Sequence, residues 1–300
     1  IYTGEDTLSL HDALPIFIGL VAMGWHMASH LPKLGHPVWV WNRTAEKASS
    51  HAQTFGTLQV ELQQAMQADI IFSCLPTSAD VETLIALHPP KSGSLWVDCT
   101  SGVPESAQRI STDLAARGVT YLDAPVSGQT IGAERGTLTV MVGGNIAGFE
   151  RAKPIIQAFA GLIEYVGESG AGFAVKAVNN TLMATHLWAL CEGLSILKNR
   201  GVDLAGALSC INHSSGKSTM SETVMAQKVL SRTFQKTFAL NLLQKDIGIA
   251  MDLVKEGQMK TPVFQVTQEL FLKTNREQAM QVDFSVAVTQ LEKWNSVRLV

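Results

Sequence analysis

The sequence predicts an α/β protein in which a doubly wound sheet is followed by an all-α C-terminal domain. Short apolar runs alternate with helical stretches from Ile16 to about residue 168. A glycine-containing turn follows the first of these runs, and no strand pattern is present after about residue 168. Short apolar strands separated by helices are typical of a parallel sheet with helices on both faces.

Each predicted strand is a short apolar run bounded by a helical or turn-rich segment. The predicted strands cover residues 16–20, 38–41, 69–75, 95–98, 119–124 and 137–142. A helix is expected at residues 24–34, directly after the first strand. Gly143, Gly144 and Pro154 are expected to end this region, because glycine and proline interrupt regular structure.

The remainder of the chain has a helical pattern. A long helix is expected at residues 174–200, followed by helices at 204–212, 220–230 and 240–256. We therefore expect a cofactor-binding domain over residues 15–168. An all-helical domain for substrate binding and oligomerisation follows over 169–300, beginning with a long interdomain helix. Residues 1–14 show no periodicity and are interpreted as an extension or a sequence artefact.

Composition argues against several classes of function. Hydrophobic residues make up 46% of the chain and charged residues 16%, which is ordinary for a globular protein. The net charge of −3 provides no strong field for nucleic acid or an anionic membrane. No apolar run approaches the roughly 20 residues that span a bilayer. The four cysteines are far apart and form no CxxC pair, so we expect a cytoplasmic protein with reduced thiols.

The first strand runs into Gly19-Leu20-Val21-Ala22-Met23-Gly24 and then into the first helix. A Rossmann-type dinucleotide fold has its glycines here, so that backbone N–H groups at a helix N-terminus meet the pyrophosphate. We expect Gly19, Val21, Met23 and Gly24 to contact the cofactor. Val21 stands where the second glycine is usual, so its β-branched side chain is expected to crowd the cofactor or shift the loop. The alternative is an ordinary strand-to-helix turn.

The second strand ends in Trp41-Asn42-Arg43-Thr44, about 20 residues beyond the glycine loop. NAD-selective sites usually have an acid here to hold the ribose 2′-hydroxyl, whereas a nearby arginine accommodates a 2′-phosphate. No acid lies between Val38 and Thr44. Asn42, Arg43 and Thr44 are therefore expected to bind NADP in preference to NAD. A solvated surface loop is the alternative.

Five ordered blocks give the chain a specific resemblance to a known family. They are Leu75-Pro76-Thr77, Asp98-Cys99-Thr100-Ser101, the segment from Asp123 to Gly144, Lys176 with Asn179-Asn180, and Lys245-Asp246. From Ile16 to roughly its end, the chain resembles the β-hydroxyacid dehydrogenases. This family includes 3-hydroxyisobutyrate dehydrogenase, tartronate semialdehyde reductase and glyoxylate/succinic semialdehyde reductase. The resemblance implies hydride transfer between NADP(H) and a small β-hydroxyacid, or the matching aldehyde or keto acid, in a homodimer or homotetramer.

The resemblance implies a substrate-carboxylate site at Ser127 and Gly128, where a hydroxyl and backbone N–H groups bind an anion. The family usually continues with another glycine, but this chain has Gln129. A larger polar side chain there is expected to narrow the pocket or to add a contact to a longer substrate. The substrate's identity is therefore open at this position.

Lys176 is the expected catalytic residue. It lies in an apolar stretch of the long helix, where burying a lysine is costly and desolvation would lower its pKa toward neutrality. Asn180 is four residues further on, on the same helix face. The resemblance implies that Lys176 gives a proton to the carbonyl oxygen as hydride arrives, while Asn180 orients the substrate oxygens. A lysine that reaches solvent is the alternative.

The resemblance also assigns further residues to the cofactor. Lys245 matches a family lysine near the nicotinamide end, in a cleft between the domains, and a surface pair with Asp246 is its alternative. Leu75, Pro76 and Ser101 resemble loop positions that line the cofactor at the carboxyl ends of strands.

No metal site is predicted, because His26 and His30 lack a third ligand nearby. Two other functions stay open. Imine reductases and reductive aminases share this architecture but generally lack the lysine, so Lys176 argues against that role. A non-catalytic cofactor-binding module is the other alternative, because Val21 could weaken cofactor binding.

Overall fold

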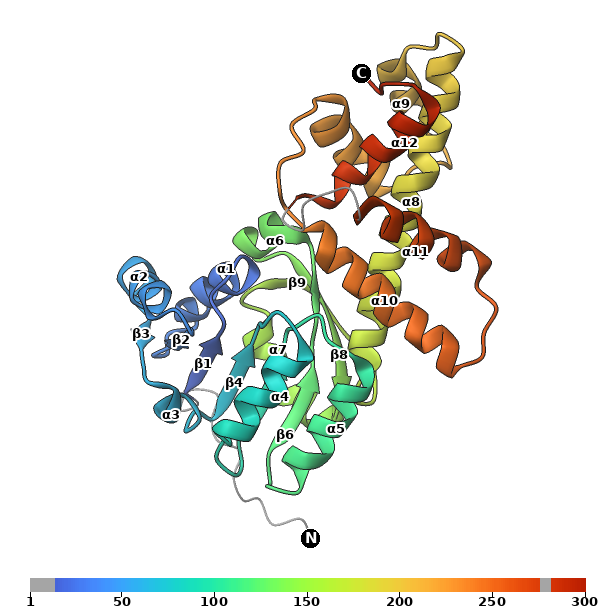
Figure 1. Cartoon of the computed structure of the whole chain (residues 1–300). Coiled ribbons are helices and arrows are strands. Elements are labelled where there is room, and N and C mark those ends of the chain that lie inside the picture. The colour runs from blue at the N-terminus through green and yellow to red at the C-terminus, as the bar shows by residue number, and fades with distance from the viewer. Residues whose placement is uncertain (1–13, 276–281) are drawn as a thin grey trace. The chain divides into compact units, whose positions relative to one another are not determined.

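The computed structural model describes residues 14–275 and 282–300 (Figure 1). The chain divides into two compact units, the first ending at Lys176 and the second running from Ala177 to Val300. The proposed extension over residues 1–14 lies outside the described residues except for Leu14. The backbone carbonyl of Leu14 accepts hydrogen bonds from Asp69 and Ile70, so backbone pairing begins just before the first strand.

The first unit is built on a sheet of nine strands within the described residues. They are β1 (Pro15–Ile18), β2 (Trp39–Trp41), β3 (Leu58–Gln59), β4 (Ile70–Ser73), β5 (Leu95–Asp98), β6 (Thr120–Asp123), β7 (Val126–Ser127), β8 (Leu138–Gly144) and β9 (Ala160–Gly167). The strand order is β3-β2-β1-β4-β5-β6-β8-β7, and β9 pairs with β8. Strands β1 to β6 are parallel, and chain order reverses between β1 and β4, as in doubly wound folds.

The predicted parallel arrangement holds for β1 to β6, but one edge of the sheet is mixed. Strand β8 runs antiparallel to β6 and β7 and parallel to β9. Strand β9 was not predicted because its side chains are mostly partly exposed, so it lacks a continuous apolar run. Pro154 does not end the region either: it lies inside α7 (Ile146–Ile156), near the helix's last turn, and β9 follows.

Helices cover both faces of the sheet (Figure 1). Because side chains alternate along a strand, Phe17 joins the core on one face while its neighbours Ile16 and Ile18 join the core on the other. Helices α1 (Met23–His30) and α7 contribute to the first core, and α4 (Ser78–Leu87) and α5 (Pro104–Ala115) to the second. The remaining helices of this unit are η1 (Leu31–Leu34), α2 (Ala45–Phe55), α3 (Leu62–Ala65) and α6 (Gln129–Arg135). The predicted helix at 24–34 is therefore an α-helix followed by a 3₁₀ turn that contains Pro32.

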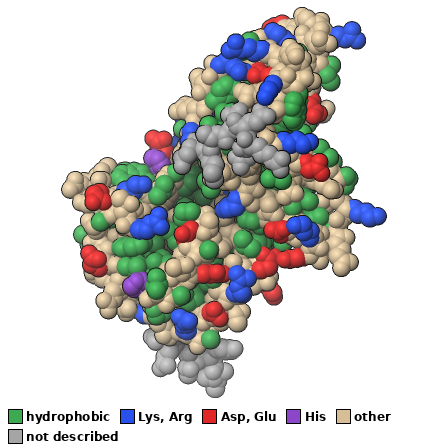
Figure 2. Space-filling model, viewed as in Figure 1, with side chains coloured by type: hydrophobic (Ala, Val, Ile, Leu, Met, Phe, Trp, Pro, Cys, Tyr) green, Lys and Arg blue, Asp and Glu red, His purple; other side chains and the backbone are tan. Residues whose placement is uncertain are grey.

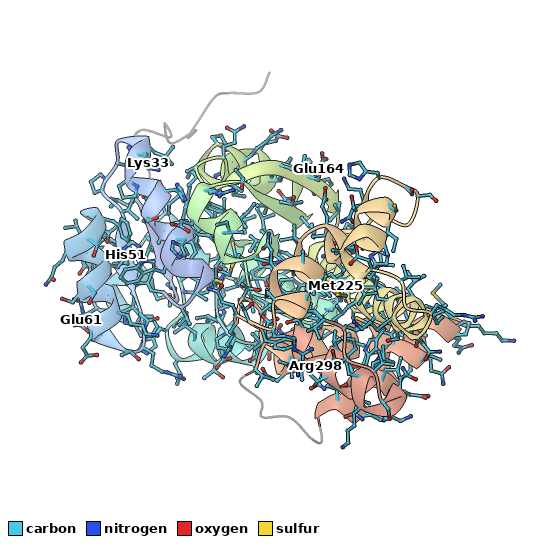
Figure 3. All side chains as sticks on the ribbon, turned by 90° about the horizontal axis from the view of Figure 1, so that it is seen from above. Lys33, His51, Glu61, Glu164, Met225 and Arg298 are labelled. Atoms are coloured by element: carbon cyan, nitrogen blue, oxygen red, sulfur yellow. The ribbon has the colours of Figure 1, made fainter. Side chains whose placement is uncertain are left out.

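Helix α8 (Ala171–Asn199) begins in the first unit and continues as the first element of the second. The other helices are α9 (Leu204–Asn212), η2 (Met220–Leu230), α10 (Leu240–Glu256), α11 (Pro262–Asn275), η3 (Phe284–Val286) and α12 (Ala287–Asn295). Segment η2 is a π-helix, whereas the sequence predicted only a helix of unspecified type. Met225 of η2, labelled in Figure 3, is fully buried. It belongs to the hydrophobic core of the second unit, which also contains Trp188 and Phe271.

The surface has no marked separation of charge in the view of Figure 2, where acidic and basic side chains are interspersed. This agrees with the net charge of −3. Across residues 14–275 and 282–300, no helix is long and apolar enough to cross a membrane.

A buried ion pair joins distant segments of the second unit. Lys228 Nζ lies 2.9 Å from Asp283 Oδ2, and the two side chains are 8% and 0% exposed. The same oxygen accepts the N–H groups of Thr237 and Phe238. Burial alone raises the pKa of Asp283, but hydrogen bonds from Ser285, Thr237 and Lys228 outweigh burial, and the pKa is lowered. The carboxylate is therefore charged and fully engaged in the folded protein.

We predict that Asp283→Asn lowers the free energy of unfolding by about 3 kcal/mol, because it leaves the buried Lys228 ammonium without its counter-charge. Asp252→Asn, in the exposed Lys255–Asp252 pair, is the control and should cost less than about 0.5 kcal/mol. Denaturant unfolding measures both.

The pH dependence of this difference has a definite sign. A lowered carboxyl pKa contributes stability that is present above the unfolded-state value of 3.8 and is lost as the pH falls through the folded value. The stability gap between wild type and Asp283→Asn should thus be constant near neutrality and shrink below pH 3.8. An equal cost for both substitutions, or a gap that widens in acid, would contradict this account of the ion pair.

Candidate active site

The carboxyl ends of five parallel strands meet at one edge of the sheet. Ile18 is in register with Trp41 and Ser73, Ser73 with Asp98, and Asp98 with Asp123. The segments that follow these strands contain most of the predicted site: Gly19–Gly24, Asn42–Thr44, Leu75–Pro76, Ser101 and Ser127–Gln129. In open α/β sheets this edge, at the switch of strand order, is where ligands bind.

The glycine loop makes a tight connection between β1 and α1. Gly19 has φ of +96°, and a Cβ there would lie 2.3 Å from the carbonyl oxygen of Cys74. A Cβ on Gly24 would lie 2.0 Å from the carbonyl oxygen of Gly19. Only glycine allows this approach, which brings the start of α1, at Met23, close to the end of the strand. The turn has the form that presents backbone N–H groups to a phosphate.

Val21 departs from the usual glycine pattern of this loop. It is 54% exposed, so the protein does not bury its β-branched side chain. The next residue, Ala22, has φ of +37°, a region that non-glycine residues rarely adopt. The backbone of the loop is therefore strained at Ala22, and the side chain of Val21 takes up space that a glycine would leave open.

Asn42 ties the second strand to the glycine loop. Its Oδ1 accepts the N–H of Leu20 at 2.9 Å, and its Nδ2 donates to the carbonyl of Thr44 at 3.0 Å. The side chain is buried, whereas Arg43 and Thr44 are exposed beside it. Asn42 thus has a structural role in the loop, and the side chains of Arg43 and Thr44 are accessible to a ligand.

Asp98, at the end of β5, is the centre of a buried hydrogen-bond network. Its carboxylate accepts from Ser73 Oγ at 2.9 Å, Tyr121 OH at 2.9 Å and the N–H of Thr100 at 3.1 Å. Trp96 Nε1 donates to Ser73 Oγ at 2.9 Å. Burial raises the pKa of Asp98 above its usual value, although the hydrogen bonds oppose the rise. The network joins the ends of three neighbouring strands.

The loops after β4 and β5 are joined to each other through Thr100. Its Oγ1 accepts the N–H of Leu75 at 3.1 Å. Leu75 is partly exposed, Pro76 is exposed and Ser101 is partly exposed. The three predicted cofactor positions therefore lie on two loops that the network of Asp98 holds in place.

The predicted substrate motif leaves the sheet in an unusual conformation. Ser127, partly exposed on β7, pairs with Thr139 of β8. Gly128 follows with φ of +137° and Gln129 with φ of +59°. A non-glycine residue in the left-handed region costs about 1 kcal/mol. The position where the family usually has glycine is thus strained by Gln129 here.

Lys176 lies on the second turn of α8 and is 9% exposed. Asn180, one turn further on, is 3% exposed. The start of the helix is held by Asp123 of β6, whose Oδ1 accepts the N–H of Gly170 at 2.8 Å and whose Oδ2 accepts that of Phe173 at 3.0 Å. The predicted lysine is therefore a buried residue on a helix fastened to the same sheet edge as the glycine loop.

Asn180 belongs to a polar group in the second unit. Its Nδ2 donates to Asp246 Oδ2 at 2.6 Å, and its Oδ1 accepts from Asn179 Nδ2 at 3.1 Å. Lys245 Nζ lies 3.4 Å from Asp246 Oδ1, in a pair where Asp246 is buried and Lys245 is partly exposed. Lys245 therefore pairs with Asp246, but Asp246 is buried and also orients the amide of Asn180.

His30 of α1 and His51 of α2 have structural partners. His30 Nε2 lies 2.8 Å from the carbonyl of Ala133. His51, labelled in Figure 3, bonds to Thr57 Oγ1 and to the carbonyl of Trp25, and burial lowers its pKa. In the part of the chain that the structure describes, no three His, Cys, Asp or Glu side chains are placed to hold a metal ion.

The sequence reasoning missed the residues that hold the site together. Asp98 and Asp123 were seen only as parts of family blocks, and Asp246 only as a partner of Lys245. A usable signal was present: an aspartate directly at the end of an apolar strand is buried at high cost unless it accepts several hydrogen bonds. Such residues indicate hydrogen-bond donors nearby, although the sequence does not identify them.

Comparison with known families supports this architecture. Residues 16–167 match the model described as the NAD binding domain of 6-phosphogluconate dehydrogenase. Residues 170–291 match the model described as NAD-binding of NADP-dependent 3-hydroxyisobutyrate dehydrogenase. The chain belongs to the 3-hydroxyisobutyrate dehydrogenase family. It is therefore an oxidoreductase that binds a nicotinamide cofactor, and the family resemblance of its motifs is confirmed.

Individual relatives are similar over most of their length. The chain is 37% identical to 2-(hydroxymethyl)glutarate dehydrogenase of Eubacterium barkeri, covering 85% of this chain and 87% of the relative. It is 33% identical to 3-hydroxyisobutyrate dehydrogenase of Pseudomonas aeruginosa, covering 85% and 90%. Among solved structures, Mycobacterium tuberculosis 3-hydroxyisobutyrate dehydrogenase with L-serine superposes with a TM-score of 0.85, at 26% identity, covering 93% and 99%. The two-part architecture predicted from the sequence is confirmed.

Proposed function

We propose that this chain is an NADP-preferring β-hydroxyacid dehydrogenase that also reduces the matching aldehyde or keto acids, with Lys176 as its general acid and base. The observation that carries this proposal is the buried lysine on α8, a helix fastened to the sheet edge where the cofactor loops begin. Burying a lysine costs free energy, so an exposed fraction of only 9% supports a role for Lys176 in proton transfer.

The residues of the first unit fit a nicotinamide dinucleotide. The turn between Gly19 and Gly24 is compact enough to present backbone N–H groups to a pyrophosphate. Arg43 and Thr44, exposed after β2, supply a positive charge and a hydroxyl for a 2′-phosphate. The adjacent loops contain Leu75, Pro76 and Ser101, which contact the cofactor in this proposal. A bound cofactor supplies or accepts the hydride.

In the reductive direction, the Lys176 ammonium gives a proton to the substrate's carbonyl oxygen as that carbon becomes an alcohol. In the oxidative direction the neutral amine takes the proton back. Asn180, on the same face of α8, orients the substrate oxygens, and its own amide is oriented by Asp246. Ser127 and Gly128 bind the substrate carboxylate through a hydroxyl and backbone N–H groups.

The relatives suggest a substrate class. Two relatives are named for 2-(hydroxymethyl)glutarate and 3-hydroxyisobutyrate, and L-serine accompanies the Mycobacterium structure. In all three compounds a hydroxymethyl group is attached to the carbon that bears a carboxylate. We propose the same unit for this chain, with the remaining substituent contacting Gln129. The strain at Gln129 supports such a contact, because strained backbone concentrates at functional sites.

Lys176→Ala should lower kcat by about a hundredfold to ten-thousandfold, because it removes the general acid. NADPH oxidation, followed with aldehyde acids, and NADP+ reduction, followed with the three hydroxyacids above, measure this. The dissociation constant for NADPH should change little. Lys198→Ala is the matched control: Lys198 is an exposed lysine of the same helix that bonds to the carbonyl of Val300. Turnover indifferent to Lys176, or turnover of imines alone, would contradict the proposal.

Arg43→Ala should raise the Michaelis constant for NADPH about tenfold, because it removes the cation from the 2′-phosphate. The constant for NADH should be nearly unchanged. Asn42→Ala is the contrasting variant: it releases the tie between Leu20 and Thr44 and should weaken both cofactors alike. Steady-state kinetics with each cofactor distinguish the two patterns. An equal change in the Michaelis constants for NADPH and NADH in Arg43→Ala would contradict recognition of the 2′-phosphate by Arg43.

Val21→Gly should tighten NADPH binding by about fivefold, since removing a crowding side chain relieves on the order of 1 kcal/mol. Val21 is exposed, so the substitution leaves no cavity in the protein core. Fluorescence titration with NADPH measures the dissociation constant. A weaker or unchanged constant would show that the pyrophosphate does not approach the loop at this residue.

A further inference from the structure

Asp123 holds the start of α8 from a different element of the first unit. Its side chain is fully buried at the end of β6, and both of its oxygens are used. Oδ1 accepts the N–H of Gly170 at 2.8 Å, and Oδ2 accepts the N–H of Phe173 at 3.0 Å. Helix α8 begins at Ala171, so Gly170 directly precedes the helix and Phe173 lies in its first turn. N–H groups at the start of a helix have no partner within the helix. The cap thus comes from the sheet.

Glycines around the carboxylate leave no freedom in this contact. A Cβ on Gly143 would lie 2.8 Å from Asp123 Oδ1, and a Cβ on Gly172 would lie 2.9 Å from Oδ2. A Cβ on Gly172 would also lie 2.4 Å from the carbonyl oxygen of Met141. The helix start and β8 therefore both approach the carboxylate as closely as backbone can.

Phe173 is held from a second side. A Cβ on Gly102 would lie 2.3 Å from the Phe173 ring and 2.5 Å from Ser78 Oγ. Ser78 Oγ in turn accepts the N–H of Val103 at 2.9 Å, which joins the loops after β4 and β5. The backbone of Phe173 is thus set by Asp123, and its ring by the loop that bears Ser101.

Lys176 follows Phe173 by three residues, so it lies one turn further along the same side of α8. We propose that Asp123 is a positioning residue for the reaction: by holding the first turn of α8 it sets the place of the Lys176 ammonium relative to the cofactor loops. This inference rests on the proposed function of Lys176. A misplacement of about 1 Å in a catalytic group can cost about a hundredfold in rate.

The ionisation of Asp123 is coupled to this role. Burial raises the pKa of the carboxyl group to about 6, although the hydrogen bonds from Gly170 and Phe173 oppose the rise. The ionisable groups that face it are Asp98 of β5, whose charge raises the pKa further, and Tyr121 of β6. As the pH falls through about 6, the carboxyl group of Asp123 takes up a proton on one oxygen. That oxygen then forms a weaker hydrogen bond with the N–H group that donates to it. Turnover should decline in the same range.

The test is Asp123→Asn, which keeps the shape and one acceptor oxygen but turns an NH₂ group toward one of the two N–H groups. We expect kcat to fall about tenfold to a hundredfold, with the dissociation constant for NADPH changed by no more than about twofold. The acid limb near pH 6 should be absent from the kcat profile of the variant. Asp203→Asn is the matched control, because Asp203 likewise accepts two N–H groups at the start of α9. Its kcat and pH profile should equal those of wild type.

An unchanged kcat in Asp123→Asn, an acid limb that persists in it, or an equal loss of NADPH binding would overturn the inference. If the wild type turns over no substrate, the proposed function fails on its own account. In that case, or if the variant does not fold, the contact of Asp123 with the start of α8 is tested by amide hydrogen exchange. Exchange rates of wild-type residues 168–175 are measured and corrected for the intrinsic rates. Protection that decreases as the pH is lowered from 7.5 to 5 supports the role of Asp123 in holding the helix, and protection independent of pH overturns it.

Discussion

Two buried carboxylates at the ends of neighbouring strands organise the first unit. Asp98 and Asp123 are in register on β5 and β6, and neither is exposed to solvent. Asp98 accepts three hydrogen bonds and orders the loops after β4 and β5, while Asp123 accepts two backbone N–H groups and orders the start of α8. The proposed cofactor loops and the proposed catalytic helix are thus fixed to one edge of one sheet.

Burying these charges has a cost, which is visible in the raised pKa of each carboxyl group. A buried carboxylate that loses its donors is strongly destabilising, so the network is stable only when all of its members are in place. This links function to folding. The loops after β4 and β5 and the first turn of α8 form only when the strand ends are aligned. A correctly folded sheet therefore has the elements of the proposed site already arranged.

Much of this was predictable from the sequence. The strands with continuous apolar runs, the glycine turn at Gly19–Gly24 and the long helix with Lys176 were all predicted close to their observed places. Local patterns determine these features. Strand β9 was missed because its partly exposed side chains show no apolar run. Strand β8 was predicted, but its antiparallel direction was not, because a hydrophobic pattern does not indicate strand direction.

The supporting contacts of the site were not predictable in the same way. Asp123 and the N–H groups it accepts are 47 and 50 positions apart, and Asn180 and Asp246 are 66 apart. Nothing local in the sequence connects such pairs. Only an aspartate at the end of an apolar strand indicates that a donor must exist. The site residues were therefore recognised from motifs, whereas the interactions that place them came from the three-dimensional arrangement.

We propose that this chain transfers a hydride between NADPH and an aldehyde acid with the help of Lys176. The most direct measurement is deuterium transfer: wild type and Lys176→Ala are incubated with an aldehyde acid and with NADPH that has deuterium at both positions of the nicotinamide C4, and the product is examined by mass spectrometry. We expect wild type to yield the hydroxyacid with one deuterium on the alcohol carbon, while the variant yields almost none in the same time. Wild-type product without deuterium, or equal labelling by both proteins, would contradict it.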